Sequence, residues 1–261
     1  MIKNVKLALT FLGVVILSSS AMAQGLPGQP AQPSQAEIKA FQDIQNMQDP
    51  AEKIAAADSF AISHPQSMLL PYILTFAAEA SQQMGESPKA IIYYDKVLEA
   101  DPKNYNAMIN IAQETANATG KFDLNKDEKL SRATDLAKQA MELIPTAEKP
   151  NPNVSDADWE AFKQQNMART HEALAMVDVA QQNFSDAVTE FQTAIEMFPM
   201  PNPGTMIRLG NALNEAGRPD EAIPVLDQVI AMQGLPPAFI DIAKNEKKRA
   251  EQLKQKAAAG K

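Results

Sequence analysis

The sequence predicts an all-α fold in which helix pairs stack side by side into a superhelix. Hydrophobic residues make up 45% of the chain but aromatic residues only 6%, a balance that favours close-packed helices over a β-sandwich. Residues 183–199 form a short amphipathic segment that places Ala187, Phe191 and Ala194 on one face and ends at Pro199. The same spacing recurs at Ala90, Tyr94, Val97 and Pro102, at Ala133, Ala137, Ala140 and Pro145, at Ala222, Leu226, Val229 and Gly234, and more weakly at Lys53, Ala57, Phe60 and Pro65.

The N-terminus has the pattern of a secretory signal peptide. Lys3 and Lys6 precede an apolar run of 11 residues at 7–17, and Ala21-Met22-Ala23 fits a cleavage site, so residues 1–23 are expected to be removed. The alternative is an uncleaved anchor, but a membrane span needs roughly 20 apolar residues. We therefore expect a periplasmic or secreted protein. Cys is absent, which excludes a bacterial lipoprotein and disulfide bonds.

The charge of the chain disfavours several classes of partner. The formal net charge is −8, and removal of Lys3 and Lys6 with the signal peptide makes the mature chain more acidic. An acidic chain without long basic runs is a poor candidate for binding nucleic acid or anionic lipid. No apolar run after the signal approaches the length of a membrane span, so we expect none in the mature protein.

The N-terminal half is predicted to begin with a linker and continue as alternating helices and caps. Residues 24–36 are rich in Pro, Gly and Gln and are predicted to be disordered, with a tethering role or, alternatively, a PxxP ligand. The helical repeat domain is expected to span residues 37–256. Its first helices are predicted at 37–47, at 50–62 after the Asp49 cap, at 69–84 before Gly85, and at 88–100. A helix at 105–119 then precedes an insertion at 121–130.

The C-terminal half continues the alternation with one long helix. We predict helices at 131–143, at 155–182, at 184–198, at 205–216, at 219–232 and at 238–256. The segment 155–182 is about 40 Å long if it is unbroken, with a bend near Asn166 as the alternative. Pro224 lies inside its helix, where it removes one hydrogen bond. The last helix carries a polar outer face, as a terminal cap requires, and residues 257–261 are expected to form a disordered tail.

The residues at these positions resemble the tetratricopeptide repeat family, whose unit is a 34-residue pair of antiparallel helices. The best copy runs Met206-x-x-Leu209-Gly210-x-x-Leu213, followed by Gly217 and Ala222. The resemblance covers about residues 37–234 and implies a right-handed superhelical α-solenoid of about five helix pairs plus the C-terminal capping helix. It also implies a concave groove lined by the first helix of each pair, and a non-catalytic scaffold for protein–protein interactions.

By the same resemblance, the groove residues are mostly polar and amide-rich. Amides both donate and accept hydrogen bonds, which suits an extended peptide backbone. The alternative is that these are solvated helix faces. The family's carboxylate clamp is not expected, because Glu79 would repel a carboxylate. The predicted partner-binding residues are Tyr72, Thr75, Glu79, Gln82, Asn106, Ile109, Asn110, Gln113, Asn117, Arg169, Glu172, Met176, Ile207, Asn211 and Asn214.

The sequence offers no motif for catalysis, a metal or a cofactor. His171-Glu172 opens like a zinc-protease motif, but Ala175 stands where the second His is required. Asp123-x-Asn125-x-Asp127 is similar to the start of a calcium loop, but the next position lacks the required Gly. We therefore expect no enzyme activity, no cofactor and no metal site.

Two further hypotheses stay open at the level of sequence. The basic stretch 244–256 motivates a structural or self-associating envelope protein in which stacks meet through their end helices, so a homo-oligomer is one alternative. An enzyme or a small-ligand binder with its site in the groove is the other, supported only by the groove's polarity. The single Trp, Trp159, is expected to pack against neighbouring helices rather than to be exposed, and His171 is expected to pack between paired helices.

Overall fold

A computed structural model describes residues 32–198, 200 and 202–259, and this part of the chain contains eleven helices and no strand. The predicted signal peptide and most of the predicted linker lie outside the described residues. Within them, no helix combines the length and the apolar character that crossing a membrane requires. The helices are α1 (Gln35–Asn46), α2 (Pro50–Ser63), α3 (Leu70–Gln83), α4 (Ser87–Ala100), α5 (Tyr105–Ala118), α6 (Lys126–Thr146), α7 (Asp156–Gln181), α8 (Phe184–Met197), α9 (Pro203–Glu215), α10 (Pro219–Ala231) and α11 (Pro237–Ala259).

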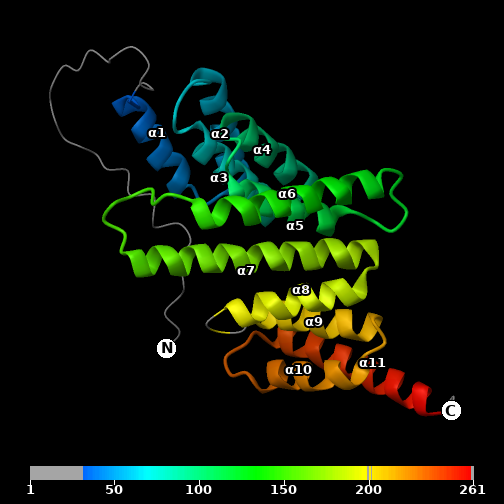
Figure 1. Cartoon of the computed structure of the whole chain (residues 1–261). Helices are drawn as coiled ribbons and strands as arrows, with labels where there is room; N and C mark the ends of the chain where they lie inside the picture. The colour runs from blue at the N-terminus through cyan, green and yellow to red at the C-terminus, as the bar shows by residue number, and fades with distance from the viewer. Residues whose placement is uncertain (1–31, 199, 201, 260–261) are drawn as a thin grey trace.

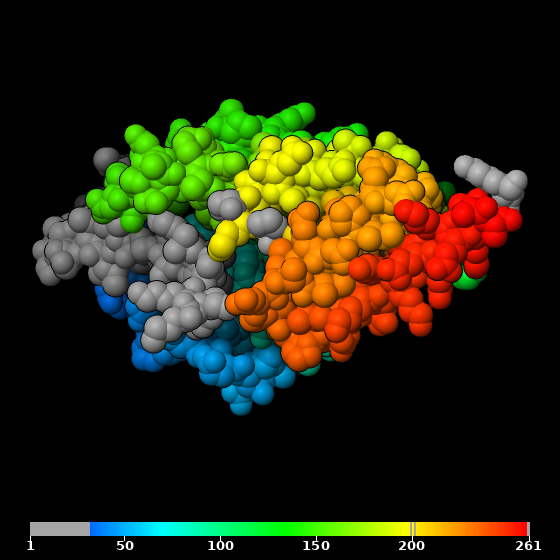
Figure 2. Space-filling model, turned by 90° about the horizontal axis from the view of Figure 1, so that it is seen from below, coloured from blue at the N-terminus to red at the C-terminus, as the bar shows by residue number. Residues whose placement is uncertain are grey.

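Successive helices form pairs that stack in chain order (Figure 1). The pairs are α1 with α2, α3 with α4, α5 with α6, α7 with α8, and α9 with α10, and α11 packs on α9 and α10. Each first helix also contacts the second helix of the preceding pair, as α5 does with α4 and α9 with α8. The chain is thus an α-solenoid of helix pairs. Figure 2 shows it from below, with the C-terminal helices (orange and red) in front.

Small residues occupy the positions where helices approach most closely. Ala90, Ala133, Ala187 and Ala222, which begin the recurring pattern of the second helices, are all fully buried at 0% exposure. Large apolar side chains such as Tyr94, Phe191 and Leu226 fill the space beside them. Because a single pair cannot cover its apolar face, stacking of neighbours supplies the burial that stabilises each pair.

The long helix α7 joins two parts of the hydrophobic core. One cluster of buried side chains extends from Phe41 to Val177, and the other extends from Ala175 to Ala250. Both clusters therefore use α7, which runs without a break through Asn166 over 26 residues. Asn166 is buried and its side chain donates a hydrogen bond to the carbonyl of Phe162, so the polar group is satisfied within the straight helix. The alternative that this helix splits near Asn166 is therefore wrong.

Three predicted boundaries need correction. Helix α1 begins at Gln35, inside the predicted linker, because Ser34 and Glu37 form a capping box. Helix α6 begins at Lys126 within the predicted insertion, with Asp127 and Glu128 favourably placed in its first turn. Helix α11 continues to Ala259, so most of the predicted disordered tail is helical.

Candidate functional site

The first helix of each pair lies on one side of the stack, and these helices line two pockets there. We call the first the N-terminal pocket; it is a cavity of about 390 Å³ between α1, α3, α5 and α7, with Tyr94 of α4 at its base. The second, the C-terminal pocket, measures about 370 Å³ and lies between α5, α7, α9 and α11, with Phe191 of α8 at its base. Helices α5 and α7 contribute to both pockets, so the two form successive parts of one surface.

Arg169 is the most distinctive side chain of the N-terminal pocket. Its Nη1 donates to Asn106 Oδ1 at 3.3 Å and to Asn166 Oδ1 at 3.1 Å, and its Nη2 donates to Asn110 Oδ1 at 3.3 Å. Among the described residues, no carboxylate forms an ion pair with it. Burial lowers the pKa of the Arg169 guanidinium, although nearby acidic groups oppose that shift. Three neutral amides therefore hold a partly buried positive charge in place without neutralising it.

A second hydrogen-bonded chain connects α4, α3 and α5 beside Arg169. The Tyr94 hydroxyl donates to Gln82 Oε1 at 2.9 Å, and Gln82 Nε2 donates to Glu114 Oε1 at 2.8 Å. Burial raises the pKa of the Tyr94 hydroxyl, so it stays a donor across the physiological range. These bonds fix the amide of Gln82 and leave the neighbouring Glu79 as the acidic group that faces the cavity.

The surrounding protein stabilises the Glu79 carboxylate only in part. Burial raises the pKa of its carboxyl, and the charges of Lys53 and Arg169 act in the opposite direction. Within the described part of the chain, its carboxylate makes no hydrogen bond or ion pair. Lys53 is engaged elsewhere, since its Nζ donates to the carbonyl of Gln45 at 3.3 Å and lies 5.9 Å from the centre of the Phe76 ring.

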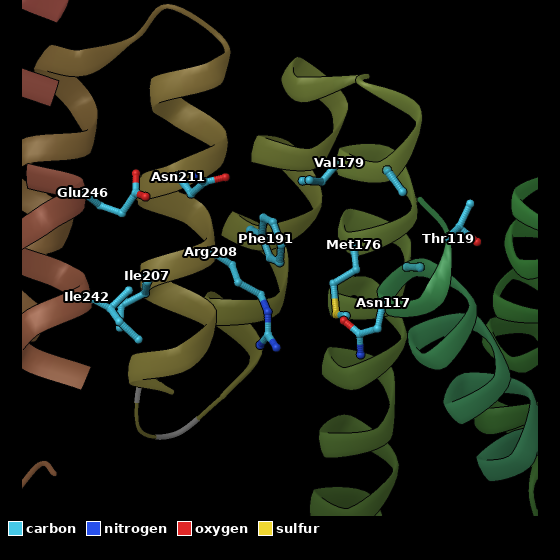
Figure 3. A pocket seen from close by; sticks show the side chains of 12 residues that line it. Asn117, Thr119, Met176, Val179, Phe191, Ile207, Arg208, Asn211, Ile242 and Glu246 are labelled. Carbon is cyan, nitrogen blue, oxygen red and sulfur yellow. The ribbon is translucent and has the colours of Figure 1, made fainter. Parts of the chain in front are cut away.

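The C-terminal pocket is more apolar. Figure 3 shows its side chains approaching from α9 and α11 on one side and from α7 and α5 on the other. Met176, Phe191, Ile207 and Ile242 supply apolar surface, and Ile242 is 51% exposed. Arg208 also lines the pocket, and its Nη1 donates to Glu172 Oε1 at 2.8 Å, which neutralises both charges.

The structure brings most of the predicted groove residues together, but in two groups. Tyr72, Thr75, Glu79, Gln82, Asn106, Asn110 and Arg169 line the N-terminal pocket. Asn117, Met176, Ile207 and Asn211 line the C-terminal pocket. Gln113 is half-buried and lines neither pocket.

Three of the predicted residues are buried and cannot present their side chains to a partner. Ile109 is 0% exposed and belongs to the core, because α5 contacts both its own partner α6 and the long helix α7. Asn214 is 3% exposed, since α11 covers it and its Nδ2 donates to the carbonyl of Glu246 at 3.1 Å. Glu172 is 7% exposed and serves as the ion-pair partner of Arg208.

Sequence reasoning missed lining residues at two places. Phe162, Gln165 and Asn166 of α7 line the N-terminal pocket, because α7 has 26 residues whereas the first helices α3 and α5 have 14 each. Ile242 and Glu246 of α11 line the C-terminal pocket. The apolar spacing of α11 could have indicated this, since a capping helix occupies the place of the next first helix.

Other side chains singled out in the sequence have structural roles. Trp159 is 8% exposed, stacks on Phe162 at a ring-centre distance of 5.2 Å and donates from Nε1 to the carbonyl of Ala147 at 3.2 Å. His171 Nδ1 lies 2.6 Å from Glu190 Oε2, across the α7–α8 pair. Both residues therefore pack between elements, as predicted.

Three of the six basic side chains in the stretch 244–256 pair with carboxylates of neighbouring helices. Lys247 pairs with Asp227 at 2.7 Å, Arg249 with Glu215 at 2.6 Å and Lys254 with Asp220 at 2.5 Å. These contacts join α11 to α9 and α10. The basic stretch that motivated self-association through the end helices is therefore used, in good part, to hold the cap on its own stack.

Comparison with known proteins finds similarity to tetratricopeptide repeat proteins. Residues 172–237 and residues 72–104 match tetratricopeptide repeat models. A thermophilic tetratricopeptide repeat protein of Thermus thermophilus superposes with a TM-score of 0.54 at 13% identity, over 81% of this chain and 95% of that one. MamA of Desulfovibrio magneticus also gives a TM-score of 0.54, at 15% identity, over 77% of this chain and 96% of that one. At these identities the likeness concerns the fold, and no curated protein matches the sequence.

Proposed function

Because the chain belongs to the tetratricopeptide repeat family, we propose that it is an exported, non-catalytic scaffold that binds a protein or peptide segment along its first helices. The family is commonly an interaction scaffold, and stacked repeats offer an extended surface for such binding. The observation that carries the proposal is that two pockets lie along the same two helices, α5 and α7. An extended segment that crosses α7 would enter both.

The chemistry of the two pockets suits a peptide. The N-terminal pocket offers the amides of Asn106 and Asn110, which can hydrogen-bond to backbone groups in either sense. The C-terminal pocket offers apolar surface at Met176 and Ile207, where a large apolar side chain can be buried at about 25 cal/mol per Å². Backbone contacts would thus supply affinity in one pocket, and a side-chain anchor would supply it in the other.

The experiment uses two matched double variants of the chain from Gln24 onward. Asn117→Lys with Asn211→Lys alters the C-terminal pocket, whereas Gln139→Lys with Gln192→Lys adds the same charge on exposed positions of the second helices α6 and α8. Random peptides of about 12 residues, about 40 Å when extended, are selected by display on the unmodified chain. Their affinities for all three proteins are then measured by fluorescence anisotropy.

We expect the pocket variant to lose at least about tenfold in affinity, or about 1.4 kcal/mol, and the variant of the second helices to stay within about twofold. Equal losses in both variants, or a failure to select any peptide, would contradict the proposal. Export is tested separately, by fractionating cells that express the full chain and sequencing the N-terminus of the product. A product that starts near Gln24 in the periplasm or medium supports export, and an intact chain in the cytoplasm contradicts it.

A further inference from the structure

The N-terminal pocket contains two opposite charges that do not pair with each other. Arg169 of α7 and Glu79 of α3 line the same cavity, yet their charged atoms are not within the 4.0 Å of an ion pair. Burial shifts the pKa of each group, and the other charge opposes that shift, together with Lys53 for Glu79 and with Glu172 for Arg169. A buried charge without a partner is unfavourable, and a group that supplies both missing partners would stabilise the two together.

We propose that the N-terminal pocket binds a small zwitterion, an α-amino acid or a short peptide with free ends, whose carboxylate meets Arg169 and whose ammonium group meets Glu79. This proposal does not depend on binding of a longer peptide across both pockets. It assigns a small-molecule site to the first part of the surface.

The arrangement around Arg169 suits a carboxylate. Guanidinium groups bind carboxylates through two parallel hydrogen bonds, which are among the strongest in proteins. The oxygens of Asn106, Asn110 and Asn166 already hold the Arg169 side chain in position. Little side-chain freedom would therefore be lost when a carboxylate binds.

Glu79 makes the site selective against simple ions. An anion without a cationic group would approach Arg169 but would be repelled by the Glu79 carboxylate. A cation without an anionic group would approach Glu79 but would be repelled by Arg169 and by the nearby Lys53. Only a ligand that carries both charges is attracted by Arg169 and by Glu79 at the same time. The site thus selects its ligand by repelling single ions as well as by attracting zwitterions.

The remaining walls predict which side chain the ligand carries. Phe41, Tyr72, Phe76 and Phe162 contribute aromatic surface to the cavity. Aromatic rings pack favourably on one another at centroid distances of about 4.5–7 Å. The cavity of about 390 Å³ falls in the size range of small-ligand pockets. We therefore expect aromatic amino acids to bind more tightly than glycine.

The test measures binding of five probes to the chain from Gln24 onward, which contains every described residue, by calorimetry and thermal shift. The probes are L-phenylalanine, glycine, N-acetyl-L-phenylalanine without the ammonium group, phenethylamine without the carboxylate, and the dipeptide Phe-Phe. We expect L-phenylalanine or the dipeptide to raise Tm, and each derivative that lacks one charge to bind at least about tenfold more weakly. The tighter of the two zwitterions identifies the source of the ligand.

Two variants test which side chain binds each charged group of the ligand, and a third serves as the control. Arg169→Gln should weaken zwitterion binding by at least about tenfold. Glu79→Gln removes no hydrogen bond or ion pair within the described residues. It should weaken the binding of L-phenylalanine and at the same time abolish the discrimination against N-acetyl-L-phenylalanine. Gln192→Lys, at an exposed position of α8 that lines neither pocket, should leave the affinity unchanged.

Three results would overturn the proposal. The first is that no zwitterion binds or raises Tm. The second is that N-acetyl-L-phenylalanine or phenethylamine binds as tightly as L-phenylalanine. The third is that Glu79→Gln leaves the discrimination between charged forms intact. Peptide selection across both pockets can succeed or fail independently of these outcomes, so the two proposals are separable.

Discussion

Gly210 of α9 lies directly against Leu226 of α10. A Cβ atom placed on Gly210 would stand 2.6 Å from Leu226 Cδ2 and 2.7 Å from its Cγ, closer than non-bonded carbon atoms approach. Leu226 is fully buried, so its side chain has no open space into which it could move. The absence of a side chain at Gly210 thus lets the two helices of this pair pack at their observed separation.

We therefore expect Gly210→Ala to destabilise the protein, although alanine is the better helix former by about 1 kcal/mol. Overpacking a core costs about 1–3 kcal/mol, so a net loss of about 1–2 kcal/mol is expected in urea denaturation. A double-mutant cycle with Leu226→Ala tests the cause, because the added methyl group should cost nothing once the leucine is gone. If the two substitutions are additive, contact between these side chains does not explain the loss.

The pKa of Asp178 predicts a dependence of stability on pH. Burial, followed by the charges of Asp186 and Glu190, raises this pKa from 3.8 to about 6. The native state then holds the proton more tightly than the unfolded chain does, so stability falls as the pH rises from about 4 to about 6 and stays low above that. The full shift corresponds to about 3 kcal/mol, which we reduce to about 1 kcal/mol because the side chain is half-buried and screened by solvent.

The variant Asp178→Asn removes this titration. Its free energy of unfolding should exceed that of the unmodified chain by about 1 kcal/mol at pH 7 and should equal it near pH 3.5. Urea denaturation at a series of pH values between 3.5 and 8 measures the difference. Glu196→Gln, an exposed change on α8 with the same loss of charge, is the control and should show no comparable gain. A constant difference across the series would show that titration of Asp178 is not the cause.

The fold could be predicted because its determinants are local and repeated. Ala90, Ala187 and Ala222 recur at near-constant spacing, and each lies at 0% exposure where helices meet. Gly210 stands in the same pattern for the same steric reason. Turn glycines could also be predicted, since Gly85 and Gly217 adopt φ values of +72° that other residues rarely accept.

The candidate site was less predictable because it depends on how far each helix extends. The first-helix pattern located Arg169 and Asn110, which hydrogen-bond to each other across α7 and α5. It also placed Ile109 and Asn214 in the groove, whereas neighbouring helices cover both. Burial of Asn214 follows from the position of α11, which the repeat pattern alone does not give because it ends before that helix.

Trp159 provides a spectroscopic test of the packing around α7. It is the only tryptophan in the chain, is 8% exposed and stacks on Phe162. Native fluorescence should therefore be blue-shifted and should move to longer wavelength on unfolding. Trp159→Phe keeps an aromatic ring but loses the hydrogen bond to Ala147, so a cost of about 1 kcal/mol is expected in circular dichroism melts. Native emission typical of a solvated indole would contradict this placement.

Substitutions in α11 can distinguish how much ion pairs and how much packing contribute to the stability of its attachment. Its ion pairs to α9 and α10 involve exposed side chains, such as Lys254 and Asp220 at 58% and 70% exposure, and exposed pairs contribute about 0–1 kcal/mol. Ala243 and Ala250, in contrast, are fully buried. We expect Lys254→Ala to change the free energy of unfolding by less than about 0.5 kcal/mol, with no further effect of 1 M salt.

Ala250→Asp should instead cost about 3 kcal/mol or more, because it buries a charge with no partner. Urea denaturation compares the two variants, and Ala257→Asp, at an exposed position of the same helix, controls for the added charge. A large loss in Lys254→Ala together with a small one in Ala250→Asp would mean that ion pairs rather than small-residue packing hold the cap. The opposite order is expected, since close approach of small residues is the contact that recurs in the second helices, at Ala90, Ala133, Ala187 and Ala222.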